Sequence, residues 1–167
     1  LYQAMAQGIL ARLNGAGFVV GRVMKGMLAL SVAVRRRTGW RVGRVLMRSV
    51  RRRIAPDLSL LGCGGARLDE ETAWLLEGLG FEVLTGYGLV ETSSVSTYNR
   101  KGNGRIGTEG LPVPGTEIRI HNPDADGIGE IHLRGPHVFE GYYHDPAATA
   151  AAFAEDRWFR TGRDRRS

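Results

Sequence analysis

The sequence predicts an α/β fold that is followed by a β-rich part. Residues 58–63 form a short apolar run bounded by glycine, which is typical of a buried strand. Residues 69–79 have the features of a helix, and residues 81–85 alternate between apolar and polar side chains as a second strand does. A glycine-containing turn follows each predicted strand. The order of strand, turn, helix, strand and turn is that of an α/β protein.

The helix predicted over residues 69–79 carries signals at both of its ends. Asp69 is placed to accept hydrogen bonds from the first backbone N–H groups, and Glu70 and Glu71 lie near the positive end of the helix dipole. Gly80 suits the left-handed conformation that commonly ends a helix. These signals place the helix between the two predicted strands.

The chain becomes β-rich from about residue 102 onward. Residues 117–121 and 130–134 alternate cleanly, and strong turn formers lie between them, so we expect a hairpin. Residues 146–153 are rich in alanine and predict a short helix with Pro146 in its first turn.

The net charge of +6 is divided unevenly along the chain. Residues 1–56 hold twelve Lys or Arg and no Asp or Glu, which gives +12. Residues 57–167 hold eleven basic and seventeen acidic residues, which gives −6 and accounts for the total. This asymmetry predicts different partners for the two parts.

A basic amphipathic helix is predicted within residues 41–54. Its apolar face consists of Val42, Val45, Leu46, Val50 and Ile54, and its opposite face carries Arg41, Arg44, Arg48, Arg51 and Arg52. Such a helix can lie on an anionic membrane surface or meet a phosphate-rich ligand. The alternative is a solvated face whose acidic neighbours lie in sequence outside this chain. Nucleic acid is not expected as a partner, because no nucleic-acid-binding motif accompanies the arginines.

Length and composition are those of one ordinary domain, with 167 residues, 43% of them hydrophobic and 24% charged. The single Cys63 excludes a disulfide within the chain, so we expect a cytoplasmic protein, peripheral at the membrane if the basic helix binds there. The longest apolar run, residues 26–34, is about half of a bilayer span. The four histidines are scattered without the spacing of metal ligands, and we assign them no catalytic role. We divide the chain into a basic helical segment (1–56), an α/β portion (57–115) and a truncated β-rich subdomain (116–167).

The segment of residues 86–92, Gly-Tyr-Gly-Leu-Val-Glu-Thr, is the most informative in the chain. It places glycines, an aromatic ring, a carboxylate and a hydroxyl directly after a predicted strand. Together these groups can hold a flat heterocycle, a phosphate and a metal ion. Both glycine turns, the other at residues 64–66, fall at strand ends, where open α/β sheets usually bind ligands.

Several motifs in order resemble those of the adenylate-forming acyl-CoA synthetases, and most of all the long-chain fatty acid–CoA ligases. The matching segments are residues 64–66 with Leu68, 86–93, 105–110, 129–131, 134–136, 141–143 and 158–162. The resemblance covers nearly all of the chain. It implies part of the large N-terminal domain of such an enzyme, with an α/β sheet subdomain that carries the adenine site and a barrel-like, β-rich subdomain.

The resemblance also implies a chemistry, in which ATP activates a fatty acid as an acyl-adenylate and CoA then forms the thioester. The residues expected to bind ATP or AMP are Gly65, Ala66, Gly86, Tyr87, Gly88, Leu89 and Val90. Glu91 is the expected catalytic residue and the ligand of Mg²⁺. Tyr87 would stack on adenine, and the alternative is that its ring packs on the core at the end of a strand. For Glu91 the alternative is a carboxylate in the first turn of a helix. Tyr142 and Tyr143 are expected to pack in the barrel.

Three departures from the family pattern limit this interpretation. Val90 stands where a threonine hydroxyl usually meets the α-phosphate, and Thr92 is not placed to replace it. Arg163 stands where an aspartate usually holds the ribose, and residues 163–167 do not resemble the family's continuation. A phosphate loop and a C-terminal domain with its catalytic lysine are not found in the chain. We therefore expect a ligase fragment that is inactive in isolation, and the alternatives are a noncatalytic nucleotide-binding remnant or a ligase for a different carboxylic acid.

Overall fold

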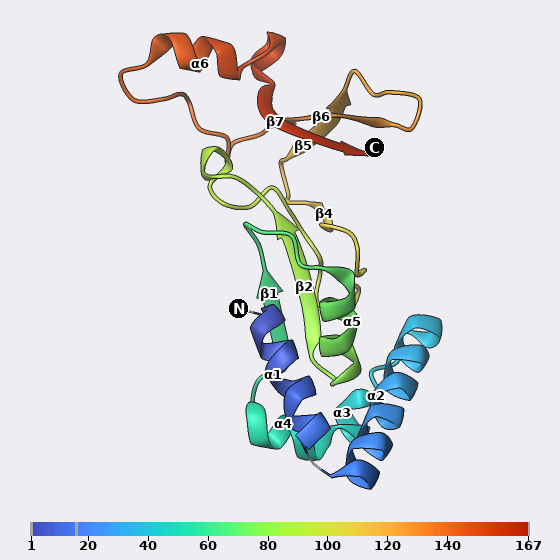
Figure 1. The fold of residues 1–167 in the computed structure, drawn as a ribbon. Coiled ribbons are helices and arrows are strands. Elements are labelled where there is room, and N and C mark those ends of the chain that lie inside the picture. The colour runs from blue at the N-terminus through green and yellow to red at the C-terminus, as the bar shows by residue number, and fades with distance from the viewer. Residues whose placement is uncertain (1, 16, 167) are drawn as a thin grey trace. The chain divides into compact units, whose positions relative to one another are not determined.

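The computed structural model describes residues 2–15 and 17–166 and divides the chain into two compact units (Figure 1). Unit 1 comprises Leu1–Thr85 and Asn99–Thr108, and unit 2 comprises Gly86–Tyr98 and Glu109–Ser167. Each unit has its own hydrophobic core, so each is described by itself.

Unit 1 is a helical layer beside a short parallel strand pair. Strands β1 (Leu60–Cys63) and β2 (Glu82–Tyr87) run parallel, with Leu60 opposite Glu82. The helices are α1 (Tyr2–Gly15), α2 (Phe18–Thr38), α3 (Gly43–Leu46), α4 (Arg48–Ile54) and α5 (Glu70–Gly78). The mixed α/β fold is confirmed. Within residues 2–15 and 17–166, none of the helices combines the length and apolar character that a bilayer crossing requires.

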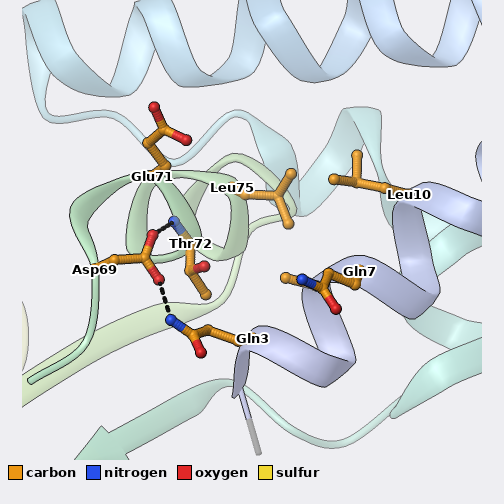
Figure 2. A pocket seen from close by; sticks show the side chains of 8 residues that line it. Gln3, Gln7, Leu10, Asp69, Glu71, Thr72 and Leu75 are labelled. Carbon is orange, nitrogen blue, oxygen red and sulfur yellow. Dashed lines mark hydrogen bonds between the residues drawn. The ribbon is translucent and has the colours of Figure 1, made fainter. Parts of the chain in front are cut away.

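The start of α5 confirms the predicted cap. Asp69 accepts a hydrogen bond from the backbone N–H of Thr72 at 2.8 Å and another from the side-chain amide of Gln3 at 3.0 Å (Figure 2). The Gln3 bond, followed by those from Thr72, lowers the pKa of Asp69 to about 2, since each bond favours the charged form. Gly80, at φ 91°, follows the end of the helix as predicted.

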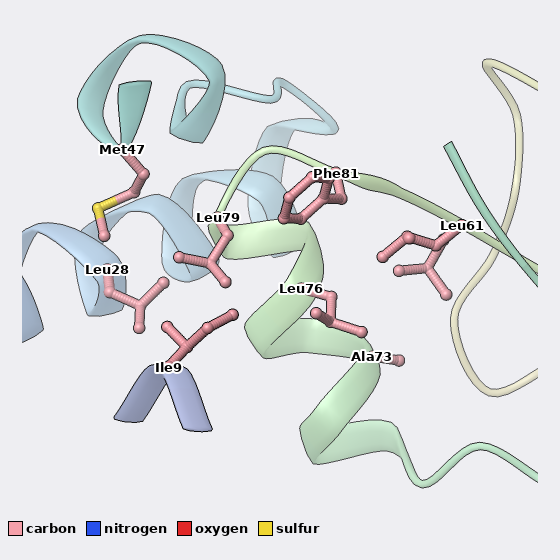
Figure 3. Packing of buried hydrophobic residues seen from close by; sticks show 9 residues of the cluster. Ile9, Leu28, Met47, Leu61, Ala73, Leu76, Leu79 and Phe81 are labelled. Carbon is pink, nitrogen blue, oxygen red and sulfur yellow. The ribbon is translucent and has the colours of Figure 1, made fainter. Parts of the chain in front are cut away.

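The core of unit 1 is built from residues far apart in sequence (Figure 3). Leu76 and Leu79 at the end of α5 and Phe81 before β2 are fully buried. Side chains from α1, α2 and β1 close around them, namely Ile9, Leu28 and Leu61. Burying apolar side chains in this way supplies most of the stability of such a domain.

The prediction of one amphipathic helix over residues 41–54 is wrong. The helix is interrupted at Met47, which lies between α3 and α4 and is 1% exposed, whereas Val45 of the predicted apolar face is 77% exposed. Met47 joins the core of unit 1 (Figure 3), and this tertiary contact overrides the local periodicity.

The idea that all acidic neighbours of the arginines lie outside the chain is also wrong. Glu77 of α5 is 1% exposed, and its Oε2 lies 2.6 Å from Nε of Arg35 and 3.2 Å from Nε of Arg41. Its Oε1 accepts the backbone N–H of Val83 at 2.9 Å. Arg41 also reaches the buried Glu82 at 3.2 Å. Part of the positive charge of the first segment is therefore neutralised inside unit 1.

Unit 2 contains an antiparallel sheet with the order β5-β6-β7. Its strands are β5 (Glu117–His121), β6 (Ile128–Arg134) and β7 (Phe159–Arg166), and the β5–β6 pair confirms the predicted hairpin. Helix α6 (Pro146–Ala152) is capped by Asp145 and confirms the predicted alanine-rich helix.

The short strands β3 (Thr97–Tyr98) and β4 (Leu111–Pro112) pair with each other, and β3 also pairs with Gly86 and Tyr87 of β2. Across the described residues the β5-β6-β7 sheet is open, so the expected barrel-like shape is not found.

Removal of the buried charge of Glu77 tests the ion cluster. Glu77→Gln leaves the largely buried guanidinium of Arg35 without its carboxylate and Arg41 with Glu82 alone, so we expect the free energy of unfolding to fall by about 3 kcal/mol. The matched control is Glu71→Gln, an exposed residue of the same helix, which should change it by about 0.5 kcal/mol or less. Urea unfolding followed by circular dichroism measures both, and equal losses would contradict the role given to Glu77.

Candidate functional site

The turn after β2 requires glycine at residue 88. A Cβ atom on Gly88 would collide with the backbone carbonyl of Ser94, so no larger residue fits without moving the backbone. Gly86 is also close to its neighbours, since a Cβ there would lie 2.8 Å from the carbonyl oxygen of Thr97. The two glycines thus let the chain fold back on itself directly after the strand.

The next residues form a tight 3-10 turn, Val90–Thr92, which is locked by the hydroxyl of Thr92. This oxygen accepts the N–H of Leu89 at 2.9 Å and donates to the carbonyl of Leu89 at 3.1 Å, and Thr92 is fully buried. The side chain of Val90, by contrast, is 91% exposed. Thr92 is therefore occupied within the turn, in agreement with the expectation that it does not replace a hydroxyl at residue 90.

Glu91 is held by two contacts from the same unit. Its backbone carbonyl accepts the N–H of Phe139 at 2.7 Å, and its carboxylate accepts the phenol of Tyr142 at 3.1 Å. Burial raises the pKa of Tyr142, and the hydrogen bond and charge of Glu91 raise it further. Tyr142 was expected to pack in a barrel, but it is 42% exposed and reaches this carboxylate; Tyr143 is 89% exposed. The expectation of packing is wrong for Tyr143, whereas the ring of Tyr142 also meets that of Phe139 edge-on, with 4.8 Å between the ring centroids.

Val90, Glu91 and Tyr142 lie on the lining of an open hollow of about 780 Å³ in unit 2. Residues 160–163 of β7 also line it, and alanines of α6 contribute apolar surface. The hollow therefore combines two carboxylates, an exposed valine and two arginines, which is a lining suited to a charged ligand.

Glu130 shapes the β7 part of this hollow. Its Oε1 accepts the backbone N–H of Gly162 at 2.9 Å, and its Oε2 lies 3.2 Å from Nε2 of the fully buried His132. Burial acts to raise the pKa of Glu130, but the bonds from Gly162 and His132, with the charge of Arg160, outweigh it and lower the pKa. The β6–β7 register shifts here. In the sequence Glu130 falls within the matching segment 129–131, but no role is predicted for it. Its partner Gly162 lies 32 residues away on a neighbouring strand, so the contact is not visible along the chain.

The remaining predicted residues lie in different places. Gly65 and Ala66 follow β1 in unit 1, where Gly65 has a φ of 77° and open space around its Cα. Tyr87 lies in unit 2, is half-buried and packs against the core around Leu133. The structure thus places Gly86 to Glu91 in one segment of unit 2 and Gly65 and Ala66 in unit 1.

A second hollow, of about 440 Å³, lies in unit 1 between α1 and the beginning of α5 (Figure 2). Gln3 and Gln7 of α1 face Asp69 and Thr72 across it. None of the residues predicted as site residues lines it.

The donor set at Glu91 fits Mg²⁺ rather than a protein-caged metal. Among the described residues there is no cluster of three or more His, Cys, Asp or Glu that could hold a metal ion. Mg²⁺ is commonly held by one or two carboxylates, with phosphate oxygens and water as its other ligands. Glu91, as a carboxylate on the lining of an open hollow, meets that requirement.

Titration of Tyr142 tests its contact with Glu91. The difference in tyrosinate absorbance between the native chain and Tyr142→Phe isolates this residue, and we expect its pKa to lie above the ordinary value of a tyrosine. In a Glu91→Gln background the same difference should shift to lower pH, because the negative charge that disfavours tyrosinate is gone. An unchanged titration would show that the two side chains do not interact.

Comparison with known proteins identifies relatives of this chain. A long-chain-fatty-acid–CoA ligase, FadD15 of Mycobacterium bovis, is 38% identical over 119 residues, which is 71% of this chain and 19% of the relative. A 4-coumarate–CoA ligase-like protein of Oryza sativa subsp. japonica is 38% identical over 112 residues, covering 59% of this chain and 20% of the relative. The chain therefore spans about a fifth of the length of these two relatives.

A solved structure agrees with the sequence relatives. A malonyl-CoA ligase in a ternary product complex with methylmalonyl-CoA and AMP superposes with a TM-score of 0.58 and 29% identity, covering 95% of this chain and 33% of that one. The family model described as AMP-binding enzyme matches residues 16–143, which contain the Gly86–Glu91 segment and Tyr142. The chain belongs to the AMP-binding enzyme family.

Proposed function

We propose that this chain is the nucleotide-binding part of an ATP-dependent long-chain fatty acid–CoA ligase. In this reaction the fatty acid carboxylate displaces pyrophosphate from ATP to give an acyl-adenylate, and the CoA thiol then displaces AMP to give the thioester. The observation that supports the proposal most is the placement of Glu91 on the lining of the unit 2 hollow, directly after the glycine turn. Family membership supports the same chemistry.

The proposed roles follow from the shapes of the residues. In unit 1, Gly65 has open space where a Cβ would stand, so a nucleotide can approach the backbone closely there, and Ala66 beside it carries little bulk. In unit 2 the space at Gly86 and Gly88 is taken by the backbone of Thr97 and Ser94, so these two glycines would act by shaping the turn that presents residues 89–91. Leu89 and Val90 line the hollow beside the nucleotide. For Tyr87, stacking on adenine stays a prediction, and its packing against the core of unit 2 supports the structural alternative.

Glu91 is the residue that would hold Mg²⁺. When bound, Mg²⁺ would neutralise charge on the phosphate oxygens of ATP. Glu91 itself contributes a fixed carboxylate oxygen, and Tyr142 orients that carboxylate by its hydrogen bond. The turn holds the backbone of Glu91, so the side chain needs little reorganisation on binding.

The nature of the acid rests on the relatives. The FadD15 ligase supports a long-chain fatty acid, whereas the 4-coumarate–CoA ligase-like protein and the malonyl-CoA ligase favour the alternative of a different acid. Val90 and Arg163 favour the alternative of a noncatalytic nucleotide-binding remnant. Because the chain spans a fifth of its relatives' length, we propose that turnover needs the remaining length of a complete ligase. A cytoplasmic location, and contact between the exposed arginines and an anionic membrane, stay predictions.

Nucleotide binding by the chain itself tests Glu91. We expect ATP to bind more tightly with Mg²⁺ than without it. Glu91→Gln should lower the affinity for ATP by about tenfold or more when Mg²⁺ is present and should leave it unchanged when Mg²⁺ is absent. The matched control is Glu140→Gln, an exposed carboxylate of unit 2 outside the hollow, which should leave the affinity for ATP unchanged.

Val90→Thr should raise the affinity for ATP by about ten- to a hundredfold, because it supplies a hydroxyl for a charged phosphate. Calorimetry measures all four proteins, and equal losses with and without Mg²⁺ in Glu91→Gln would refute the metal role.

The acid is tested with the full-length gene product. Pyrophosphate release with ATP and CoA should be faster with palmitate than with 4-coumarate or malonate. A preference for either of the latter would establish the different-acid alternative, and no release with any acid would favour the remnant.

A further inference from the structure

We infer that Arg160 and Arg163 form the phosphate-binding part of the unit 2 hollow and take over the contact that Val90 does not make. This inference rests on the proposed function, because it takes the ligand to be an adenine nucleotide. It goes further in assigning a binding role to two residues of this chain, one of which stands where the resembling family has an aspartate.

The two arginines are available to a ligand. Both belong to β7 and line the hollow, together with Val90 and Glu91. Among the described residues neither guanidinium makes a hydrogen bond or an ion pair with another side chain, although the charge of Arg160 acts on Glu130. By contrast, Arg134 of the same sheet is bound by Glu117 at 2.7 Å, and Arg119 stacks on Trp158. Within the part of the chain that the structure describes, Arg160 and Arg163 therefore differ from Arg134 and Arg119 in having no side-chain partner that holds the guanidinium group.

The backbone that carries these arginines is fixed. Gly162 lies between them with a φ of 62°, and its N–H donates to Glu130 at 2.9 Å. The N–H of Arg163 donates to the hydroxyl of Thr161 at 3.2 Å, and that hydroxyl in turn donates to the carbonyl of Ile131 at 2.9 Å. A site built on a fixed turn loses less conformational entropy on binding than one built on a mobile loop.

The carboxylates of the hollow form no ion pair with these arginines within the described residues, although the charge of Arg160 acts on Glu130. Glu130 is bonded to Gly162 and His132, and Glu91 is bonded to Tyr142. A guanidinium group presents parallel N–H donors that match phosphate oxygens, and it cannot accept a hydrogen bond from a ribose hydroxyl. The exposed Val90 side chain offers neither donor nor acceptor. Together these groups favour the phosphate of a nucleotide over its sugar.

The test compares adenosine with AMP, which differ by the phosphate alone. The native chain should bind AMP about tenfold or more tightly than adenosine. In Arg160→Gln and Arg163→Gln the affinity for AMP should fall while that for adenosine stays the same, so the ratio approaches one in the double variant. The control Arg157→Gln removes the same charge from unit 2 outside the hollow and should leave the ratio unchanged. Thermal melting confirms that each variant is folded.

The outcomes separate this inference from the proposed function. If the native chain binds adenosine and AMP equally, or if the ratio survives in the double variant, the role of the arginines is refuted while nucleotide binding stands. If the chain binds neither nucleoside nor nucleotide, the proposed function fails, and inorganic tripolyphosphate then probes the hollow directly. Tripolyphosphate binding that the double variant loses would support the arginine site, and no binding would overturn it.

Discussion

The buried carboxylate of Glu77 is the interaction on which unit 1 depends. A charge that is 1% exposed carries a large desolvation cost and persists only if it is fully paired. Arg35 of α2, Arg41 before α3 and the N–H of Val83 in β2 supply that pairing. One side chain of α5 thus binds a helix, a loop and a strand together, which explains why a segment with no acidic residue of its own packs against this part of the chain.

The turn after β2 has the corresponding role in unit 2. Its one buried hydroxyl, on Thr92, is used to bond Leu89, and its glycine at residue 88 permits the close approach to Ser94. These internal contacts leave Val90 exposed and Glu91 directed to Tyr142. Within three consecutive residues the turn therefore separates the position that holds it closed, Thr92, from the two positions that line the hollow, Val90 and Glu91.

Local signals were sufficient to predict much of the fold. Alternation in residues 117–121 and 130–134 and the cap at Asp69 act over a few residues, and all of these elements form as expected. Long-range contacts were not predictable in the same way. Met47 interrupts a periodic helix because it joins the core, and Arg35 meets Glu77 across 42 residues. In the site, the Tyr142–Glu91 bond spans 51 residues and the Glu130–Gly162 bond spans 32, so neither pattern is visible along the chain.

The two departures from the family pattern in the second half of the chain gain meaning from their position. Val90 and Arg163 line the same hollow, although 73 residues of sequence number separate them. With an aspartate at residue 163 the hollow would contain three carboxylates and one guanidinium, whereas it contains two of each. Since like charges repel an incoming phosphate, the arginine makes the hollow more favourable to an anion at the same place where the valine removes a hydroxyl. In the proposed phosphate site the two changes would act in opposite directions on one ligand group, which is the relation expected of a compensating pair.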